Sequence, residues 1–325
     1  MGIRTIEEQL VASLRDAHAL EQMALAQLKR APSIANEDAL KLALRDHEVE
    51  TRVHERLVRE RLEAHGAKPS GLRDLAAEAG GTAFVLFARA QADPPGKLAT
   101  HAFAYEHLEL AAYELVARLA ELAGDHATAV VARRIRGEEA AIAARIERLF
   151  DRTVAASLAA VAHEDPGERL MTYLNDAHAL ERQSATLLEQ ATAIGGAPEL
   201  DQAYADHLDE TRDQLAVLDE LLDARDGSPS RLKDAALTTS ALNLGLFFKT
   251  QADTPGKLAA FVYAFEHLEI GGYEQLRRVA AAARDDEVAE VARRILGDEH
   301  AAAETILGLF DVAVDASLTA VGATR

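Results

Sequence analysis

Two closely similar stretches of the chain place glutamates three positions apart beside a histidine. The stretch YEHLELAAYELV contains Glu106 and Glu109, and the stretch FEHLEIGGYEQL contains Glu266 and Glu269. Residues three apart on a helix lie about 60° apart around its axis, so each pair projects from one face. Carboxylates that share one face of an otherwise apolar helix are suited to binding divalent metal ions. The two stretches therefore predict a metal site that occurs twice.

The chain is a tandem duplication with an offset of 160 residues. At this offset the segment QADPPGKLA matches QADTPGKLA, and the segment VARRIRGEE matches VARRILGDE. Pro166 and Gly167 interrupt the helical pattern near the joint. Length alone predicts about two domains for a chain of 325 residues. We therefore expect one domain over residues 1–162 and a second over residues 163–325.

The elements that must position these glutamates are long helices. Apolar periodicity in repeat 1 predicts them over about residues 5–31, 36–64, 96–124 and 126–150, the last continuing or restarting to about residue 162. Asn36 and Asp38 offer N-cap oxygens for the second helix. The connection between the second and third helices is long enough to cross a bundle and to hold short helices around residues 72–92. The expected fold is all-α, with two tandem ferritin-like four-helix bundles that each contain a long crossover.

Composition excludes several classes of function. The net charge of −19 disfavours nucleic acid and anionic membranes as partners, because both would repel such a surface. The N-terminal MGIRTIEEQL lacks an apolar signal segment, and no apolar stretch reaches the roughly 18 residues that a membrane span needs. We therefore expect a cytoplasmic protein. Because cysteine is absent, any metal must be held by oxygen and imidazole nitrogen.

Each apolar stripe of the predicted helices is interrupted by polar residues at one level. In repeat 1 these are Glu21, His47, Glu50, Glu106, Glu109 and Glu139, and repeat 2 keeps all six as Glu181, His207, Glu210, Glu266, Glu269 and Glu299. Glutamates that converge in an apolar core cannot all stay ionised, because burying one lone carboxylate costs several kcal/mol. Two divalent cations would compensate this charge. We therefore predict a carboxylate-bridged pair of metal ions in each repeat, with the histidine as a further ligand.

The two copies also narrow the choice of histidines. Only His18, His47 and His107 have histidine counterparts in repeat 2, whereas His54 faces Gln214. We therefore expect His54 not to be an essential ligand, and His107 to give indirect support to the site. The predicted inward stripe of the second helix runs through Leu40, Leu44, His47, Glu50 and Leu57.

The pattern resembles the YciF-type ferritin-like family, also catalogued as DUF892. The resemblance rests on Glu21, the run His47-x-x-Glu50-Thr51, the segment from Glu106 to Tyr113, and the pair Glu138-Glu139. Each repeat resembles the family domain over nearly its full length. The resemblance implies a helical bundle with a di-iron site, often dimeric, in proteins associated with bacterial stress responses.

The chain departs from the pattern of better-known ferritin-like di-iron oxidases. Those carry Glu, Glu-x-x-His, Glu and Glu-x-x-His on successive helices. Here the second helix has the order His-x-x-Glu, the third has Glu-x-x-Glu, and Ile142 stands where the fourth would carry histidine. One histidine per site is closer to the oxygen-rich ferroxidase centre of ferritins, which counts against an oxygenase.

Several functions fit this sequence. The leading hypothesis is two iron ions per repeat, four per chain, with oxygen or hydrogen peroxide as oxidant, giving ferroxidase or peroxide-consuming chemistry in a protective role. Carboxylate-rich ligation also suits manganese, so a dimanganese enzyme that disproportionates peroxide is an alternative. The non-enzymatic alternatives are a metal-stabilised structural or binding protein and an interaction module without metal. The duplication also predicts that the repeats pair as a pseudo-twofold dimer within one chain.

Overall fold

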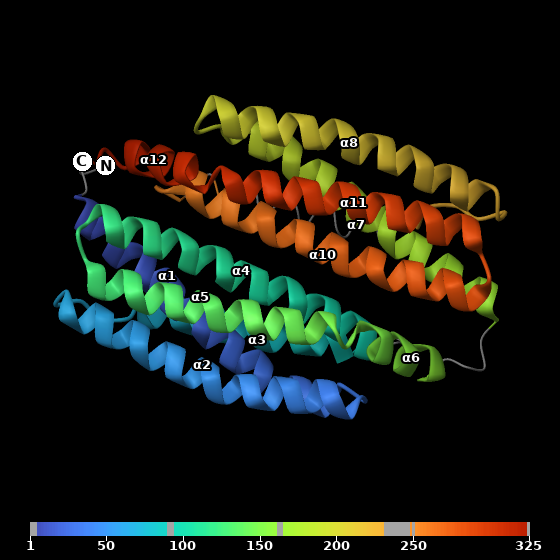
Figure 1. Ribbon diagram of the computed structural model, residues 1–325, viewed down its shortest axis with the longest axis horizontal. Coiled ribbons are helices and arrows are strands. Elements are labelled where there is room, and N and C mark those ends of the chain that lie inside the picture. The colour runs from blue at the N-terminus through green and yellow to red at the C-terminus, as the bar shows by residue number, and fades with distance from the viewer. Residues whose placement is uncertain (1–4, 90–93, 161–164, 231–247, 249–250, 324–325) are drawn as a thin grey trace. The chain divides into compact units, whose positions relative to one another are not determined.

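The regular structure in the described part of the chain is entirely helical (Figure 1). The computed structural model describes residues 5–89, 94–160, 165–230, 248 and 251–323. The chain separates into two compact units, one formed by Met1–Ala160 with Val321–Arg325 and the other by Val161–Ala320. This architecture confirms the predicted all-α class with two helical bundles. No helix among the described residues is both long enough and apolar enough to span a membrane.

Repeat 1 is built on four long helices. They are α1 (Ile6–Leu28), α2 (Asp38–Ala64), α4 (Pro94–Leu122) and α5 (His126–Glu147). Helix α1 packs against α2 and α4, and α5 packs against the same two helices, so the four form a closed bundle. A 3₁₀ turn, η1 (Ala31–Ser33), links α1 to α2, and α6 (Phe150–Ala160) follows α5 and packs on α4.

Repeat 2 has the same arrangement of helices. Its bundle consists of α7 (Pro166–Ile194), α8 (Pro198–Asp223), α10 (Thr254–Ala283) and α11 (Asp286–Gly308), followed by α12 (Phe310–Ala320). Helix α7 packs against α8 and α10, and α11 packs against both of these. The duplicated sequence therefore encodes the same bundle twice.

Within its described residues, the long crossover of repeat 1 contains one helix. This helix, α3 (Gly71–Arg89), packs mainly on α1 and also contacts α4, which replaces the several short helices expected around residues 72–92. Gly81 allows its close approach to α1, since a Cβ at this position would lie 2.5 Å from the backbone oxygen of Met23. Most of the corresponding segment of repeat 2 lies outside the described residues.

Helix α2 begins with a different cap from the one predicted. The N-cap is Glu37, whose carboxylate accepts a hydrogen bond from the backbone N–H of Leu40 at 2.7 Å. Asn36 precedes it with φ of 38°, a left-handed conformation, and Asp38 is already the first helical residue. The prediction of Asn36 or Asp38 as the cap was wrong because the chain turns at Asn36 and leaves the extended backbone of Glu37 at the cap position.

Replacement of the α5 N-cap, Asp125, by alanine is expected to destabilise the protein by about 2 kcal/mol. Asp125 Oδ1 accepts the backbone N–H of Thr128 at 3.0 Å, and its Oδ2 lies 2.8 Å from His65 Nε2. Although partial burial opposes ionisation, the hydrogen bonds from Thr128 and His65 hold the pKa of Asp125 below its usual value. The stabilisation is therefore present at neutral pH and is lost as the pH falls below the usual aspartate range.

Urea unfolding of the metal-free protein at pH 7 checks this prediction. The matched control is Asp125→Asn, which keeps an oxygen at the cap but removes the charge, and it should lose less stability than Asp125→Ala. Equal losses for both variants would show that charge, and not capping, determines the contribution of this residue.

Candidate metal centre

The bundle of repeat 1 brings potential metal ligands together at one level of its core. One group of atoms that lie within 4.8 Å of one another comes from His47 on α2, Glu106 and Glu109 on α4, and Glu139 on α5. A second group comes from Glu21 on α1, His54 on α2 and the same Glu139. All six side chains are buried, with at most 3% of each residue exposed. Glu139 therefore lies between two adjacent groups of ligands.

Most oxygens of this cluster make no hydrogen bond to any described residue. Among the described residues, neither oxygen of Glu109 or of Glu139 has a hydrogen-bond partner, and one oxygen of Glu21 also has none. Nε2 of His47 lies 3.0 Å from Glu106 Oε2, but the contact falls outside hydrogen-bond geometry. Because native cores leave few polar atoms unpaired, a set of unpaired ligand atoms directed at one another indicates room for a cation.

The outer nitrogen of each histidine faces a carboxylate. His47 Nδ1 lies 3.3 Å from Glu50 Oε2, and His54 Nε2 lies 2.7 Å from Glu138 Oε2. With the protons assigned to these outer nitrogens, the inner nitrogens, His47 Nε2 and His54 Nδ1, present lone pairs to the cluster. Metal-binding histidines commonly have such a carboxylate on the opposite ring nitrogen, where it fixes the tautomer and the ring orientation.

Other polar groups support the cluster from its edge. The buried Tyr113 hydroxyl donates a hydrogen bond to Glu21 Oε1, and the Thr51 hydroxyl donates to the backbone oxygen of His47 at 2.8 Å. Nδ1 of His107 lies 2.8 Å from the backbone oxygen of Phe103, one turn earlier on α4. Tyr113 thus contacts the site directly, whereas His107 stabilises its own helix.

The electrostatics of the cluster favour protons at its carboxylates when no cation is present. Burial raises the pKa of Glu21 to about 7, and it raises the pKa of Glu109 and of Glu139 well above the usual value. Burial opposes protonation of His47, but the charge of Glu106 raises the pKa of this imidazole well above its usual value. Divalent ions could replace these protons and supply the missing positive charge.

Repeat 2 reproduces the first group of ligands. His207, Glu266, Glu269 and Glu299 are all buried and form a cluster of the same kind. His207 Nε2 lies 2.8 Å from Glu266 Oε2, and its Nδ1 lies 3.3 Å from Glu210 Oε2. Burial raises the pKa of Glu181 to about 8, and the charge of Glu266 raises the pKa of His207 to about 9 against the effect of burial.

The structure places two of the twelve predicted ligands differently from the others. Ten are buried in the two cores, whereas the side chains of Glu50 and Glu210 are 52% and 59% exposed. These two contact the outer nitrogens of His47 and His207. Their carboxylates therefore orient the histidines in this structure, and their role as direct ligands stays a prediction.

His54 was not among the predicted ligands, but the structure places it inside the cluster. His54 is fully buried, and its Nδ1 lies 2.8 Å from Glu139 Oε1. The inward stripe of α2 continues from His47 through Thr51, His54 and Val58, and so it passes neither Glu50 nor Leu57. A core stripe alternates steps of three and four residues, and the sequence reading took a step of three where the helix takes four. The seven-residue spacing from His47 was the signal that could have identified His54.

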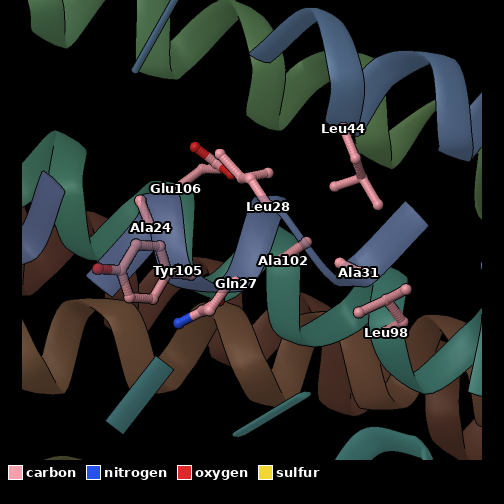
Figure 2. A pocket seen from close by; sticks show the side chains of 9 residues that line it. All are labelled: Ala24, Gln27, Leu28, Ala31, Leu44, Leu98, Ala102, Tyr105 and Glu106. Carbon is pink, nitrogen blue, oxygen red and sulfur yellow. The ribbon is translucent and has the colours of Figure 1, made fainter. Parts of the chain in front are cut away.

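A small pocket reaches the cluster beside Glu106. It has a volume of about 20 Å³, enough for roughly one water-sized molecule. Its lining is mostly aliphatic, and Glu106 and Tyr105 stand at one side of it (Figure 2). The residues around it are Ala24, Gln27, Leu28, Ala31, Leu44, Leu98, Ala102, Tyr105 and Glu106. This pocket offers a small molecule a position next to a candidate metal ligand.

Comparison with known proteins identifies the domain that is repeated. A family model described as "Domain of unknown function (DUF892)" matches residues 5–159 and matches again over residues 165–319. No solved structure matches the chain. The two family matches coincide with the two helical bundles and together cover almost all of the sequence. The chain therefore belongs to the DUF892 family and contains two consecutive copies of its domain.

Proposed function

We propose that the chain binds iron in its two bundles and uses it to oxidise ferrous ion or to consume hydrogen peroxide, in a role that protects the cell from stress. The proposed ligands in repeat 1 are Glu21, His47, Glu50, Glu106, Glu109 and Glu139, with His54 added, and those in repeat 2 are Glu181, His207, Glu210, Glu266, Glu269 and Glu299. A ferritin-like site of this kind has room for up to about two ions per repeat and four per chain.

The observation that carries the proposal is the set of unpaired ligand atoms in a closed core. Glu109 has no hydrogen-bond partner for either oxygen among the described residues, and Glu139 has none either. Structural glutamates in a core would be expected to find partners, because an unpaired buried polar group costs about 1–3 kcal/mol. The donors are carboxylate oxygens and imidazole nitrogens, a combination that suits iron and manganese. The residues present therefore fit the metal that the family resemblance implies.

Each side chain has a defined part in this proposal. Glu109 and Glu139 would hold ions, and Glu139 would contribute to both groups of ligands because its oxygens face both His47 and His54. Glu50 holds the His47 ring with its lone pair inward. Tyr113 keeps a proton directed at Glu21 Oε1 and so fixes which oxygen of Glu21 is free. A bound ferrous pair would supply the electrons that reduce oxygen or peroxide.

The pocket beside Glu106 suits a small oxidant. Aliphatic side chains such as Leu28, Leu44 and Leu98 form most of its lining and would exclude larger polar substrates. Its small volume favours oxygen or hydrogen peroxide over an organic molecule. This feature supports oxidant-dependent chemistry over a purely structural role for the metal.

Loss of Glu139 and Glu299 is expected to remove nearly all bound metal. Each belongs to the metal-ligand group of its repeat and is fully buried, so a Glu139→Ala/Glu299→Ala protein lacks a central ligand in both bundles. Elemental analysis of protein purified without chelators, before and after anaerobic ferrous loading, measures the effect. The matched control is Glu147→Ala on the exposed face of α5, which should leave the metal content unchanged.

Exposure of the loaded protein to oxygen or peroxide then tests the reaction. Rapid oxidation of the bound iron, followed by absorbance, is the expected result. Oxygen release from peroxide by a manganese-loaded sample, without activity of the iron-loaded one, would favour the dimanganese alternative. Full metal content in the double variant would contradict the assigned site, and bound metal without any turnover would leave a structural role.

A further inference from the structure

We infer that the two repeats are unequal metal sites, in which repeat 1 holds a pair of ions and repeat 2 holds a single ion. This inference rests on the proposed metal binding and concerns how the ions are distributed. The first group of ligands is present in both repeats, and His207 and Glu299 of repeat 2 correspond to His47 and Glu139 of repeat 1. The second group, which contains His54 in repeat 1, is where the two repeats differ.

Gln214 of repeat 2 occupies the place of His54 and provides a donor where repeat 1 provides a lone pair. Gln214 is buried, with 4% exposed, and its side-chain N–H donates to Glu299 Oε1 at 2.8 Å. His54 Nδ1 lies at the same distance from the equivalent oxygen of Glu139, but without a hydrogen bond. The Gln214 N–H thus satisfies Glu299 Oε1, whereas the equivalent oxygen of Glu139 in repeat 1 remains available to a cation. A second ion in repeat 2 would therefore lack a nitrogen ligand and would compete with the Gln214 N–H for Glu299 Oε1.

A second substitution in the same core acts in the same direction. Ser184 of α7 donates its hydroxyl proton to Glu269 Oε2 at 3.1 Å. The equivalent residue of repeat 1 is Ala24, and both oxygens of Glu109 are without a hydrogen-bond partner among the described residues. Two neutral donors in repeat 2 therefore engage carboxylate oxygens that are unpaired in repeat 1. In repeat 2 these hydrogen bonds partly stabilise the carboxylate charge, which in repeat 1 a second cation would stabilise.

The carboxylate that orients the histidine has also changed. His54 Nε2 is held at 2.7 Å by Glu138, whereas the equivalent residue in repeat 2 is the shorter Asp298. Rotation of the Gln214 amide could present its oxygen to a metal, but a neutral amide oxygen is a poorer ligand for iron than imidazole. Repeat 2 thus lacks both the nitrogen ligand and the long carboxylate that would position it.

The pocket next to the cluster differs between the repeats as well. Leu44 and Ala102 line the pocket of repeat 1 (Figure 2). Their counterparts in repeat 2 are the larger Tyr204 and Val262, which are buried with 2% and 0% exposed. A tyrosine and a valine fill more volume than a leucine and an alanine, so we expect less room for a small molecule beside Glu266 than beside Glu106. The paired site and the pocket lined by Leu44 and Ala102 lie in the same repeat, and we therefore expect the oxidant chemistry in repeat 1.

Two full-length proteins, each with one repeat disabled, test this inference. His207→Ala/Glu299→Ala leaves repeat 1 intact, and His47→Ala/Glu139→Ala leaves repeat 2 intact. Anaerobic equilibrium dialysis against ferrous ion, followed by elemental analysis, should find about two ions in the first protein and about one in the second. Mössbauer spectra of samples loaded with ⁵⁷Fe should show two iron environments and one, respectively. Circular dichroism confirms that each protein is folded.

Exchange of the distinguishing residues provides the matched controls. In the protein with repeat 1 intact, His54→Gln should lower the count to about one ion, because glutamine is the residue that the other bundle accommodates there. In the protein with repeat 2 intact, Gln214→His/Asp298→Glu should raise the count to about two ions by restoring the histidine and its partner. Peroxide should oxidise the iron of repeat 1 at least tenfold faster than that of repeat 2.

The outcomes separate this inference from the proposed function. About two ions in each intact repeat, unchanged by either exchange, would overturn the inference while leaving metal binding in place. Absence of iron from both proteins after loading would remove the proposed function itself. Unequal counts that follow residues 54 and 214 through both exchanges would establish the inference.

Discussion

Replacement of Glu109 by leucine is expected to stabilise the metal-free protein by about 1–3 kcal/mol while removing metal binding by repeat 1. Glu109 is fully buried, and neither of its oxygens has a hydrogen-bond partner among the described residues. Burial raises its pKa well above the usual value, which favours the protonated carboxyl group in the metal-free protein. An apolar side chain of similar size removes this desolvation cost and packs against the surrounding core.

The equivalent change in repeat 2 provides an internal comparison. Glu269 is also fully buried, but the Ser184 hydroxyl donates a hydrogen bond to it. Glu269→Leu leaves that hydroxyl without its partner, so the stabilisation should be smaller than for Glu109→Leu. Urea unfolding of both variants in the presence of a chelator measures this difference.

Iron content measured on the same samples tests the other half of the prediction. A Glu109→Leu protein that is less stable without metal would show that Glu109 makes a favourable contact in the metal-free state. A protein that keeps its full iron content would exclude Glu109 as a ligand. The expected combination, higher stability with lost binding, is typical of a residue retained for function at the expense of stability.

The stability of the metal-free protein is expected to fall between about pH 5 and pH 9, whereas that of the metal-loaded protein should rise over the same range. Burial raises the pKa of Glu21 to about 7 and that of Glu181 to about 8. When folding raises the pKa of a carboxyl group, its contribution to stability is complete at pH values below the pKa that it has in the unfolded chain. This contribution is lost as the pH rises through the pKa that the group has in the folded protein.

The histidine of repeat 2 contributes in the same direction. The charge of Glu266, opposed by burial, raises the pKa of His207 to about 9, so its contribution is complete below the usual histidine pKa and is lost towards pH 9. A metal ion needs the deprotonated carboxylates and the neutral imidazole, so its affinity increases as these protons leave. At one hundred times its dissociation constant, each ion would add about 2.7 kcal/mol to the free energy of unfolding.

Thermal unfolding from pH 5.5 to 8.5, with chelator and with saturating manganese(II), measures the two slopes. The Glu139→Ala/Glu299→Ala protein is the control, and added metal should no longer change its melting temperature. A metal-free protein whose stability increases across this range would contradict the assigned direction of these pKa shifts. Parallel curves with and without metal would show that the ions do not bind at the titrating groups.

Much of the fold was predictable because helical periodicity extends over many residues. The predicted segment at residues 36–64 corresponds closely to α2, and the duplication showed that the second bundle repeats the first. Local details were less accurate because single residues determine them. The N-cap moved to Glu37 when the backbone turned at Asn36, and the crossover of repeat 1 formed the single helix α3 against α1.

The candidate site was predicted in its composition but not in its full geometry. Glu106 and Glu109 were recognisable because they interrupt an apolar stripe in both copies. His54 was not recognisable, because its counterpart in repeat 2 is Gln214 and only histidines present in both copies were expected to be ligands. In the fold His54 lies beside Glu139, and Gln214 lies beside the equivalent Glu299, so the position is polar and buried in each repeat although its chemistry differs.

The sequence by itself determined the helical class, the duplication and most of the polar residues that face the two cores. These properties follow from periodicity and composition, which act locally along the chain. Only the tertiary structure decided which oxygens lack partners, that Glu50 faces solvent, and that His54 and Gln214 approach Glu139 and Glu299. Those relations depend on how helices distant in the sequence are rotated against one another, and a shift of one residue in a stripe turns a side chain by about 100° around its helix.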